Sequence, residues 1–268
     1  MKRRASPAGN RYARAIQMER ALLIASALAS VACGQPLDLG SDVLWATDHE
    51  GGLDAWSDGN GGVELSDMAG DVAVSDERAR SGRYAAELSV EATGSDAYAV
   101  LRRSGDLPKE AYYSAWFLVP EQYVTRSSWT IFNLQSSDGE TPNPITTGLS
   151  LNLRALPGGG YVLYVFHHDV RFLQAPIADP APIIEPGRWF HLSVFFREAS
   201  DDTGQLTAWL DGRRVYDLRH RPTGGRDHLH WSVGSVAANI PGGPARLFVD
   251  DAVVSLQRVA PEANVRAF

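Results

Sequence analysis

The amino-acid sequence predicts an all-β protein, a jelly-roll β-sandwich of two antiparallel sheets. Short segments with alternating apolar and polar residues dominate, as in 149–154, 191–196 and 206–210. Because side chains of a strand alternate with a period of two, each segment sends one set to a core and the other outward. Turn residues such as Asp211-Gly212 separate the segments, and no long stretch repeats apolar residues every 3.6 positions. Many short strands at this spacing are typical of sandwiches and jelly rolls.

Length and composition fit one globular β domain. The chain has 268 residues, of which 44% are hydrophobic and 21% charged, and this composition excludes wholesale disorder. Its single cysteine cannot form an internal disulfide, which excludes a disulfide-stapled scaffold. The length also allows two small domains, but no internal repeat or second hydrophobic pattern divides the chain. We expect one jelly-roll domain over 41–258 and a C-terminal tail over 259–268.

The N-terminal residues 1–32 are typical of an export signal. Six basic residues precede an apolar run over 21–32, which is too short to span a bilayer. Residues 30–33 (SVAC) resemble a bacterial lipobox, in which the cysteine becomes the lipidated first residue. We expect cleavage before Cys33, lipidation of Cys33, a tether over 33–40, and an extracytoplasmic protein anchored by lipid in the outer membrane or at the cell surface. A plain secretory signal that releases the protein is the alternative.

Removal of this signal makes the protein strongly acidic. The whole chain carries 25 Lys and Arg against 32 Asp and Glu, a formal charge of -7. Residues 1–32 hold six of these basic residues and one of the acidic ones, so the mature chain has 19 against 31, a charge of -12. Because phosphate contacts need clustered cations, this balance argues against nucleic acid as a partner. A highly anionic glycan would need arginine concentrated at its binding site.

Five segments, in order, resemble landmarks of known jelly rolls. Residues 48–56 (DHEGGLDAW), 80–88 (RSGRYAAEL) and 248–253 (FVDDAV) resemble the opening strand, a strand entry and the closing strand of carbohydrate-binding modules and lyase-like domains. Residues 113–120 (YSAWFLVP) and 189–192 (WFHL) resemble strands of concanavalin A-like lectin/glucanase and polysaccharide-lyase jelly rolls. The resemblance covers nearly the whole mature chain. It implies a concanavalin A-like sandwich that acts on or binds carbohydrate.

Carbohydrate in such folds binds one sheet face, where aromatic rings stack on sugars and amides fix hydroxyl groups. Alternation over 129–135 places one set of side chains, including an aromatic ring and two amides, on a single side. Trp209 alternates against an apolar set and is expected to face outward. The expected substrate-binding residues are Trp129, Asn133, Gln135, Asn152, Arg154 and Trp209. The alternative is a polar, solvated sheet face without a ligand.

The same face would suit a polysaccharide lyase that cleaves by β-elimination. In that reaction an Arg, Gln or His neutralises the uronate carboxylate, which acidifies the C5 proton, and a Tyr or His abstracts that proton. The segment 161–168 offers Tyr164 with His168, or Tyr161 with His167. If the protein is an enzyme, the implied catalytic residues are Gln135, Arg154, Tyr164 and His168. No pair of catalytic carboxylates and no Gly-x-Ser-x-Gly motif can be assigned, so a lyase is favoured over a glycoside hydrolase.

The resemblance also implies a structural Ca²⁺ site, because the opening Glu and closing Asp of many such modules bind this hard cation. The implied ligands are Glu50 and Asp250, with Asp48 and Asp251 as alternates. A capping cluster without metal is the alternative.

Two histidine pairs are candidate transition-metal sites, 228/230 and 167/168. A cupin site would need a glutamate a few residues after the first pair, and Gly234 and Ser235 stand there instead. We expect these histidines to be half-exposed strand or loop residues.

Three functions follow from these patterns. The first is a noncatalytic carbohydrate-binding protein of the bacterial cell envelope. The second is a lyase acting on a uronate-containing polysaccharide, and the third is a structural or interaction module. A polysaccharide or oligosaccharide is the expected partner of the first two. The identity of the glycan and the oligomeric state do not follow from the sequence.

Overall fold

The computed structural model describes residues 42–57, 61–65, 69–91, 97–104, 107–124, 129–138, 147–168, 172–174, 176–241 and 243–262. The chain divides into two compact units, Met1–Pro36 and Leu37–Phe268, and every described residue belongs to the second. The predicted signal, the lipidation of Cys33 and the tether therefore lie outside the described residues. In the part of the chain that is described, no helix is long and apolar enough to cross a membrane.

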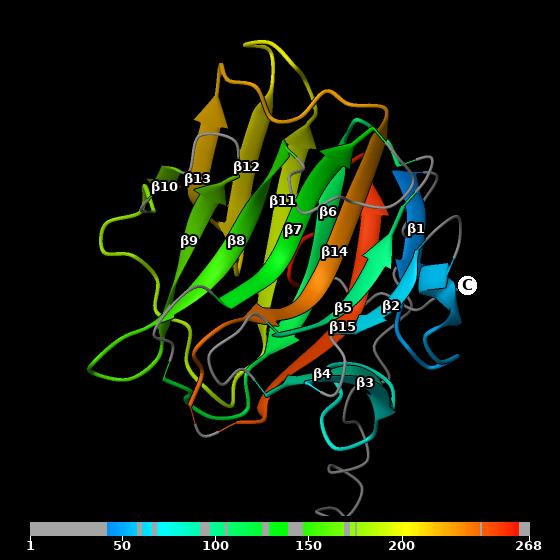
Figure 1. Ribbon diagram of the computed structural model, residues 1–268, viewed down its shortest axis with the longest axis vertical. Helices are drawn as coiled ribbons and strands as arrows, with labels where there is room; N and C mark the ends of the chain where they lie inside the picture. Colours follow the sequence, from blue (N-terminus) through cyan, green and yellow to red (C-terminus); the bar gives the residue numbers. More distant parts are fainter. Residues whose placement is uncertain are drawn as a thin grey trace, which may run out of the picture. The chain divides into compact units, whose positions relative to one another are not determined.

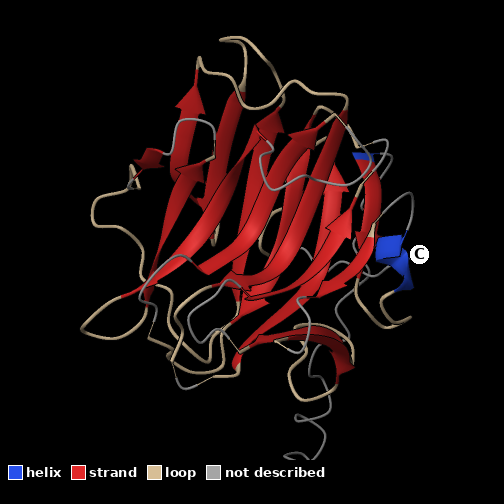
Figure 2. Cartoon of the chain, viewed as in Figure 1, coloured by secondary structure: helices blue, strands red, loops and turns tan. Residues whose placement is uncertain are grey.

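Two antiparallel sheets pack face to face in the second unit (Figures 1 and 2). Sheet A contains β1 (Val43–Thr47), β3 (Gly70–Ser75), β4 (Ala85–Val90), β6 (Glu110–Leu118), β11 (Phe190–Arg197), β12 (Gln205–Leu210), β13 (Arg213–Arg219) and β15 (Ala245–Ser255). Sheet B contains β2 (Gly62–Leu65), β5 (Ala97–Arg103), β7 (Trp129–Ser137), β8 (Thr147–Ala155), β9 (Tyr161–His167), β10 (Phe172–Gln174) and β14 (His228–Ala237). A 3-10 turn, η2 (Asp54–Ser57), follows β1.

The strand order places distant parts of the chain side by side. Sheet A runs β13-β12-β11-β6-β15-β4-β3, with β1 also paired to β15, and sheet B runs β10-β9-β8-β7-β14-β5-β2. The predicted all-β sandwich of two antiparallel sheets is confirmed.

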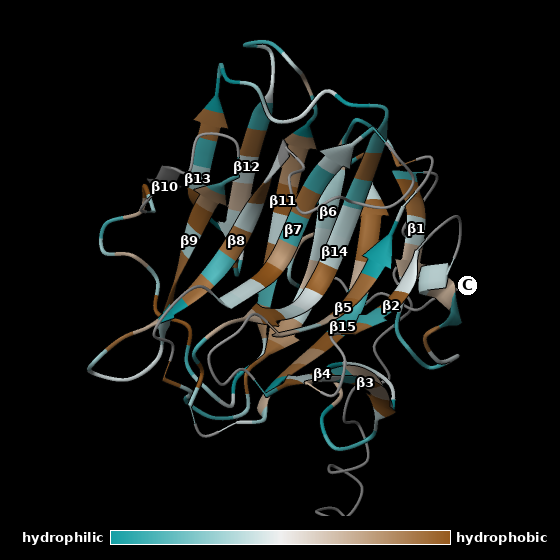
Figure 3. Cartoon of the chain, viewed as in Figure 1, coloured by the Kyte–Doolittle hydropathy of each residue, from teal (hydrophilic) through white to brown (hydrophobic). Residues whose placement is uncertain are grey.

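Alternate side chains of each strand are buried between the sheets. In β6 the alternating set that ends with Tyr113, Ala115 and Phe117 belongs to the core. Trp231 of sheet B packs against Tyr113 of sheet A, with ring centroids 5.4 Å apart, so aromatic rings join the two layers. Hydrophilic and hydrophobic bands accordingly alternate along the strands in Figure 3.

The predicted hairpin at Asp211-Gly212 is also confirmed. It connects β12 to β13, and both turn residues have positive φ, 49° and 77°. Positive φ at both central residues is what a two-residue type I′ turn requires, and Asp-Gly tolerates it.

A bulge in β7 overturns the prediction for Trp129. The register between β7 and β8 shifts between Thr130 and Phe132, so Trp129 falls on the same side as Phe132 and Leu134. Trp129 is 0% exposed, and its indole N–H donates to Ser235 Oγ over 2.7 Å. One extra residue in a strand reverses which face the following side chains occupy, and Trp129 therefore belongs to the core and not to a carbohydrate-binding face.

Strand β15 is the centre of sheet A because three strands pair with it. Its first half pairs with β4, its second half pairs with β1 along the same side, and β6 pairs along the other side. The change of partner falls at Asp250-Asp251, where the register against β6 also shifts and Asp251 has a φ of 46°. Two carboxylates therefore stand at the point where β4 and β1 approach the same strand.

The buried His191 makes the fold sensitive to acid. Its ring packs against Trp116 on the outer face of sheet A, with ring centroids 5.1 Å apart, and its Nδ1 is buried without a hydrogen-bond partner. Burial, with smaller contributions from Arg258 and Arg80, lowers the pKa of His191 to about 4. The fold thus favours the neutral form of His191. The stability that neutral His191 contributes is complete above about pH 6.5 and is lost as the pH falls towards 4.

We predict that His191→Phe reduces the loss of stability between pH 6.5 and 4 by up to about 3 kcal/mol, because Phe keeps the ring contact with Trp116 and cannot be protonated. Denaturant unfolding measured across this range checks the prediction. His220→Asn, at an exposed histidine with positive φ, is the control and should leave the pH dependence unchanged. An unaltered pH dependence in His191→Phe would contradict the prediction.

Candidate functional site

Polar side chains of neighbouring strands lie side by side on the outer face of sheet B. Residues directly opposite each other in an antiparallel pair share a face. Gln135 of β7 lies opposite Gly148 of β8 on one side and His230 of β14 on the other. Two residues earlier on β7, Asn133 lies between Ser150 and Ser232 in the same way. These cross-strand rows form the middle of the face.

The four residues predicted for catalysis share this face but do not converge on one point. The backbone N–H of His168 donates to Gly148 O over 2.9 Å, which places His168 in the row of Gln135. Tyr164 lies opposite Asn152, four residues further along β9, and Arg154 lies beyond it on β8. At about 3.3 Å per residue, Tyr164 is roughly 13 Å along the strand from His168. The geometry therefore separates a Gln135–His168 pair from a Tyr164–Arg154 pair.

Tyr164 is a neutral phenol in this setting. Burial raises the pKa of the half-buried Tyr164, and the nearby charge of Arg154 only partly opposes this. A raised pKa keeps the hydroxyl protonated near neutral pH, so Tyr164 suits a hydrogen-bond donor or acid better than a base.

Asn152 is used inside the sheet and does not serve as an open binding residue. Its side chain is on the predicted face but only 1% exposed. Its Oδ1 accepts from Thr130 Oγ1, and its Nδ2 donates to Ser150 O and Ser150 Oγ over 3.2 and 3.1 Å. With its amide satisfied by Thr130 of β7 and by Ser150 of its own strand, Asn152 is held inside the sheet, contrary to the prediction that it binds substrate.

Asn133 differs from Asn152 in one decisive respect. Its Oδ1 is buried and has no hydrogen-bond partner. Buried polar atoms in proteins are nearly always paired, so an unpaired acceptor at the middle of a polar face marks a place where a ligand donor would fit.

The prediction that His230 is half-exposed is wrong, and its place beside Gln135 was not predicted. Its Nδ1 lies 2.8 Å from Ser104 Oγ and its Nε2 lies 2.7 Å from Ser137 Oγ, and the residue is 2% exposed. Two hydroxyl groups thus fix the imidazole directly beside Gln135. The alternation of His228 and His230 with apolar Leu229 and Trp231 was the available signal.

Trp209 faces outward as predicted, but from the other sheet. It lies on β12 of sheet A, where Arg258 stacks 5.0 Å from its ring and Tyr112 lies 6.1 Å away. Alternation gives the direction of a side chain relative to its own sheet but does not tell which sheet the strand joins. Trp209 is therefore separated by the whole core from Asn133 and Gln135.

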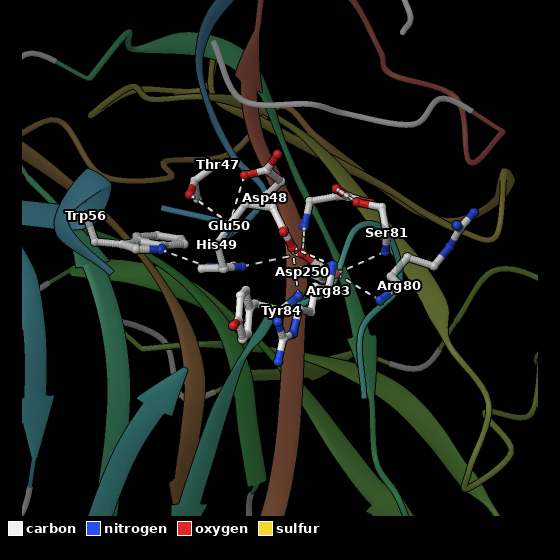
Figure 4. Close-up of polar contacts among 11 residues, drawn as sticks. Thr47, Asp48, His49, Glu50, Trp56, Arg80, Ser81, Arg83, Tyr84 and Asp250 are labelled. Carbon is white, nitrogen blue, oxygen red and sulfur yellow. Dashed lines mark hydrogen bonds and ion pairs between the residues drawn. The ribbon is translucent and has the colours of Figure 1, made fainter. Parts of the chain in front are cut away.

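Asp48, Glu50 and Asp250 of the predicted calcium site lie near the place where β1, β4 and β15 meet (Figure 4), and Asp251 follows Asp250 on β15. Asp250 Oδ2 accepts the backbone N–H groups of Arg80 and Ser81 over 2.8 and 3.2 Å. Glu50 Oε1 accepts those of Arg83 and Tyr84, both over 2.7 Å. The loop 80–84 is thus held at both ends by carboxylates from distant parts of the chain.

Gly82 is required in that loop. Its φ is 58°, and a Cβ there would collide with the Glu50 side chain. The loop can wrap around the carboxylate only with a residue that tolerates positive φ and occupies no side-chain space.

His49 links this cluster to the core. The Trp56 indole N–H donates to His49 Nε2 over 3.2 Å, which makes Nε2 the acceptor and leaves the proton on Nδ1. Nδ1 faces Asp250 Oδ1 at 3.5 Å. The chain from Trp56 through His49 orients the Asp250 carboxylate towards the loop.

Comparison with known proteins identifies the family. The family model described as polysaccharide lyase matches residues 48–250, about three quarters of the chain. The chain belongs to the polysaccharide lyase family. No curated protein sequence matches it significantly.

The fold of the chain is similar to that of solved structures, including a lyase. The endo-beta-1,4-glucuronan lyase from the fungus Trichoderma reesei is 14% identical with a TM-score of 0.57, over 80% of this chain and 96% of that one. The cellulose induced protein Cip1 is 13% identical with a TM-score of 0.57, over 80% and 98%. At such low identity these likenesses establish the fold, and the predicted resemblance to polysaccharide-lyase jelly rolls is confirmed.

In this member of the polysaccharide lyase family the carboxylate cluster has the donor chemistry that Ca²⁺ prefers. Asp251 Oδ1 accepts from Ser81 Oγ over 2.8 Å, whereas its Oδ2 is buried without a hydrogen-bond partner. Burial, followed by repulsion from Asp250, raises the pKa of Asp251 to about 7. A cation would relieve that buried charge. Among the described residues, however, no three metal-ligating side chains converge, so calcium stays a prediction.

If calcium binds here, it stabilises the fold, because a ligand that binds only the native state shifts unfolding by mass action. We predict that excess Ca²⁺ raises the melting temperature of the polysaccharide lyase family protein and that a chelator reverses this. Asp251→Asn should lose the shift while melting no lower than wild type without calcium, since its Oδ2 has no partner to lose. An unchanged midpoint together with no calcium in elemental analysis would exclude the site.

Proposed function

We propose that the protein is a polysaccharide lyase that cleaves a uronate-containing polysaccharide by β-elimination on the outer face of sheet B. Membership of the polysaccharide lyase family supports the class of reaction. The observation that carries the site is the unpaired Asn133 Oδ1, which lies one step along β7 from Gln135. It supplies an unused acceptor for a sugar hydroxyl beside the amide and imidazole groups that the chemistry needs.

The residues in the row of Gln135 have the groups for the two steps of elimination. The Gln135 amide donates to the uronate carboxylate and stabilises the negative charge that develops when the C5 proton leaves. His168, half-buried at the other end of the row, takes that proton. The C4–O bond then breaks, a C4–C5 double bond forms, and the leaving oxygen receives a proton. His230 is a positioning residue, since both of its ring nitrogens are occupied by hydroxyls.

Tyr164 and Arg154 serve a neighbouring sugar unit. Along the strands, Tyr164 lies about 13 Å and Arg154 about 20 Å from the proposed catalytic row, too far to contact the same C5 atom. A neutral phenol and an exposed guanidinium there can bind hydroxyl and carboxylate groups of the next units. The strand direction would then be the direction along which the polysaccharide extends.

The place of action is also part of this proposal. The basic and apolar pattern of residues 1–32 and the SVAC segment support export and a lipid anchor on Cys33. A polysaccharide outside the cytoplasm is then the substrate that the protein would meet.

We predict that the purified protein releases unsaturated products, detected by ultraviolet absorbance, from a uronate polymer such as glucuronan or alginate. Gln135→Ala and His168→Ala should each lower kcat by about 10²-fold or more, because each removes a group that acts on the transition state. Gln205→Ala and His220→Asn change the same residue types near sheet A and are the matched controls, with unchanged kcat expected.

The outcomes separate the candidate functions. Cleavage that survives in the Gln135→Ala, His168→Ala double variant would refute the site while leaving the class of reaction intact. Binding of the polymers without any cleavage would refute the lyase and favour the noncatalytic carbohydrate-binding protein. If the protein neither binds nor cleaves any of the acidic and neutral polymers, the structural module is favoured.

A further inference from the structure

We propose that Arg102 is a receptor for a uronate carboxylate and that Glu64 occupies it in the free protein until the polysaccharide replaces it. The inference rests on the proposed lyase function and adds a carboxylate subsite beside the candidate catalytic row.

The register places Arg102 within the polar face. Arg102 of β5 lies directly opposite Ser232 of β14, and Ser232 in turn lies opposite Asn133. Arg102 is therefore in the row of Asn133, two strands away, at a backbone separation of about 10 Å. The guanidinium itself points to Glu64 on β2, away from Asn133, so a sugar chain that contacts both residues has to extend across β14 and β5.

The present partner of Arg102 has the geometry of the proposed ligand. Nη1 of Arg102 pairs with Glu64 Oε1, and Nη2 donates to Glu64 Oε2, so two parallel contacts join guanidinium and carboxylate. A uronate presents the same two oxygens at the same spacing, and planar two-point recognition of carboxylates is the particular capability of arginine. Glu64 thus shows which ligand the site accepts.

The two members of the pair differ in how easily they can be moved. The Arg102 side chain is 12% exposed, whereas that of Glu64 is 33% exposed on β2, the edge strand of sheet B. Burial lowers the pKa of Arg102, and Glu64 acts against this. A sheltered cation needs a carboxylate partner at all times, while an exposed partner on an edge strand can rotate into water when another carboxylate arrives.

An exposed aromatic ring lies on the same face, about 13 Å along β5 from Arg102. Tyr98 lies on the same face of β5 as Arg102, four residues earlier, and is 38% exposed. An exposed ring offers an apolar surface for one sugar unit of a bound chain, and the guanidinium fixes the carboxylate of another unit. The combination favours a uronate over a neutral sugar.

Sheet A provides a matched comparison. Arg197 and Glu110 also form a two-point pair across neighbouring strands, over 2.8 and 3.0 Å, on the outer face of that sheet. Their side chains are 40% and 53% exposed, so this pair is an open surface ion pair with no sheltered cation. The Arg197–Glu110 pair therefore has the same chemistry as Arg102–Glu64 but lies on the other sheet, away from the proposed site.

The first test is Glu64→Gln, which keeps the shape and removes the competing charge. With a glucuronan or alginate that the wild-type protein cleaves, we expect KM to fall about twofold to fivefold and kcat to stay constant. The change in KM is small because a partly exposed ion pair such as Arg102–Glu64 is weak, so the substrate gains little when the competing charge is removed. Glu110→Gln should change neither. Binding of the carboxyl-reduced, neutral polymer should be equal in wild type and Glu64→Gln.

The second test is Arg102→Lys, which keeps the charge but removes the two-point geometry, and it should raise KM about tenfold. Melting temperatures show whether β2 stays in place, and Arg102→Lys carries the test if Glu64→Gln unfolds. A KM that is unchanged or raised in folded Glu64→Gln, or unchanged in Arg102→Lys, overturns the subsite. Absence of cleavage by the wild-type protein on every uronate polymer overturns the proposed function instead.

Discussion

Burial of alternate side chains in one core shared by two sheets is the constraint on which the remaining features depend. A residue that does not enter this core must lie on one of two outer faces, and the core keeps those faces apart. Amides, imidazoles and hydroxyls gather on sheet B, whereas Trp209, Tyr112 and Phe195 gather on sheet A. The protein therefore has two chemically different surfaces built from one repeated pattern.

Bulges modify this pattern at the positions that matter for chemistry. In β7 the bulge turns Trp129 into the core and leaves Asn133 and Gln135 outside. In β15 the irregularity at Asp250-Asp251 directs two carboxylates towards the loop that precedes β4. Each bulge interrupts the regular pairing of its strand, and it turns side chains in a direction that they could not have in a regular strand.

The sequence predicted the fold well because alternation and turn residues are local signals. The hairpin at Asp211-Gly212 needed only the turn chemistry and the flanking apolar residues. The site was predicted less well, since it depends on register and on strand order. Gln135 and His168 were placed on a polar face, but their distance from Tyr164 follows from pairings between strands that the sequence does not encode locally. Likewise, Trp129 was misplaced by a one-residue bulge and Trp209 by the choice of sheet.

The position of β15 has a consequence for how the chain acquires its structure. The last strand of the described chain lies at the centre of sheet A, between β6 and the pair β4 and β1. Contacts that span more than two hundred residues must form before that sheet is complete, and such long-range closure makes folding slow. An emerging chain therefore lacks the centre of one layer until its end is available. A chain shortened before Ala245 would expose three strand edges, which are open to pairing with other molecules.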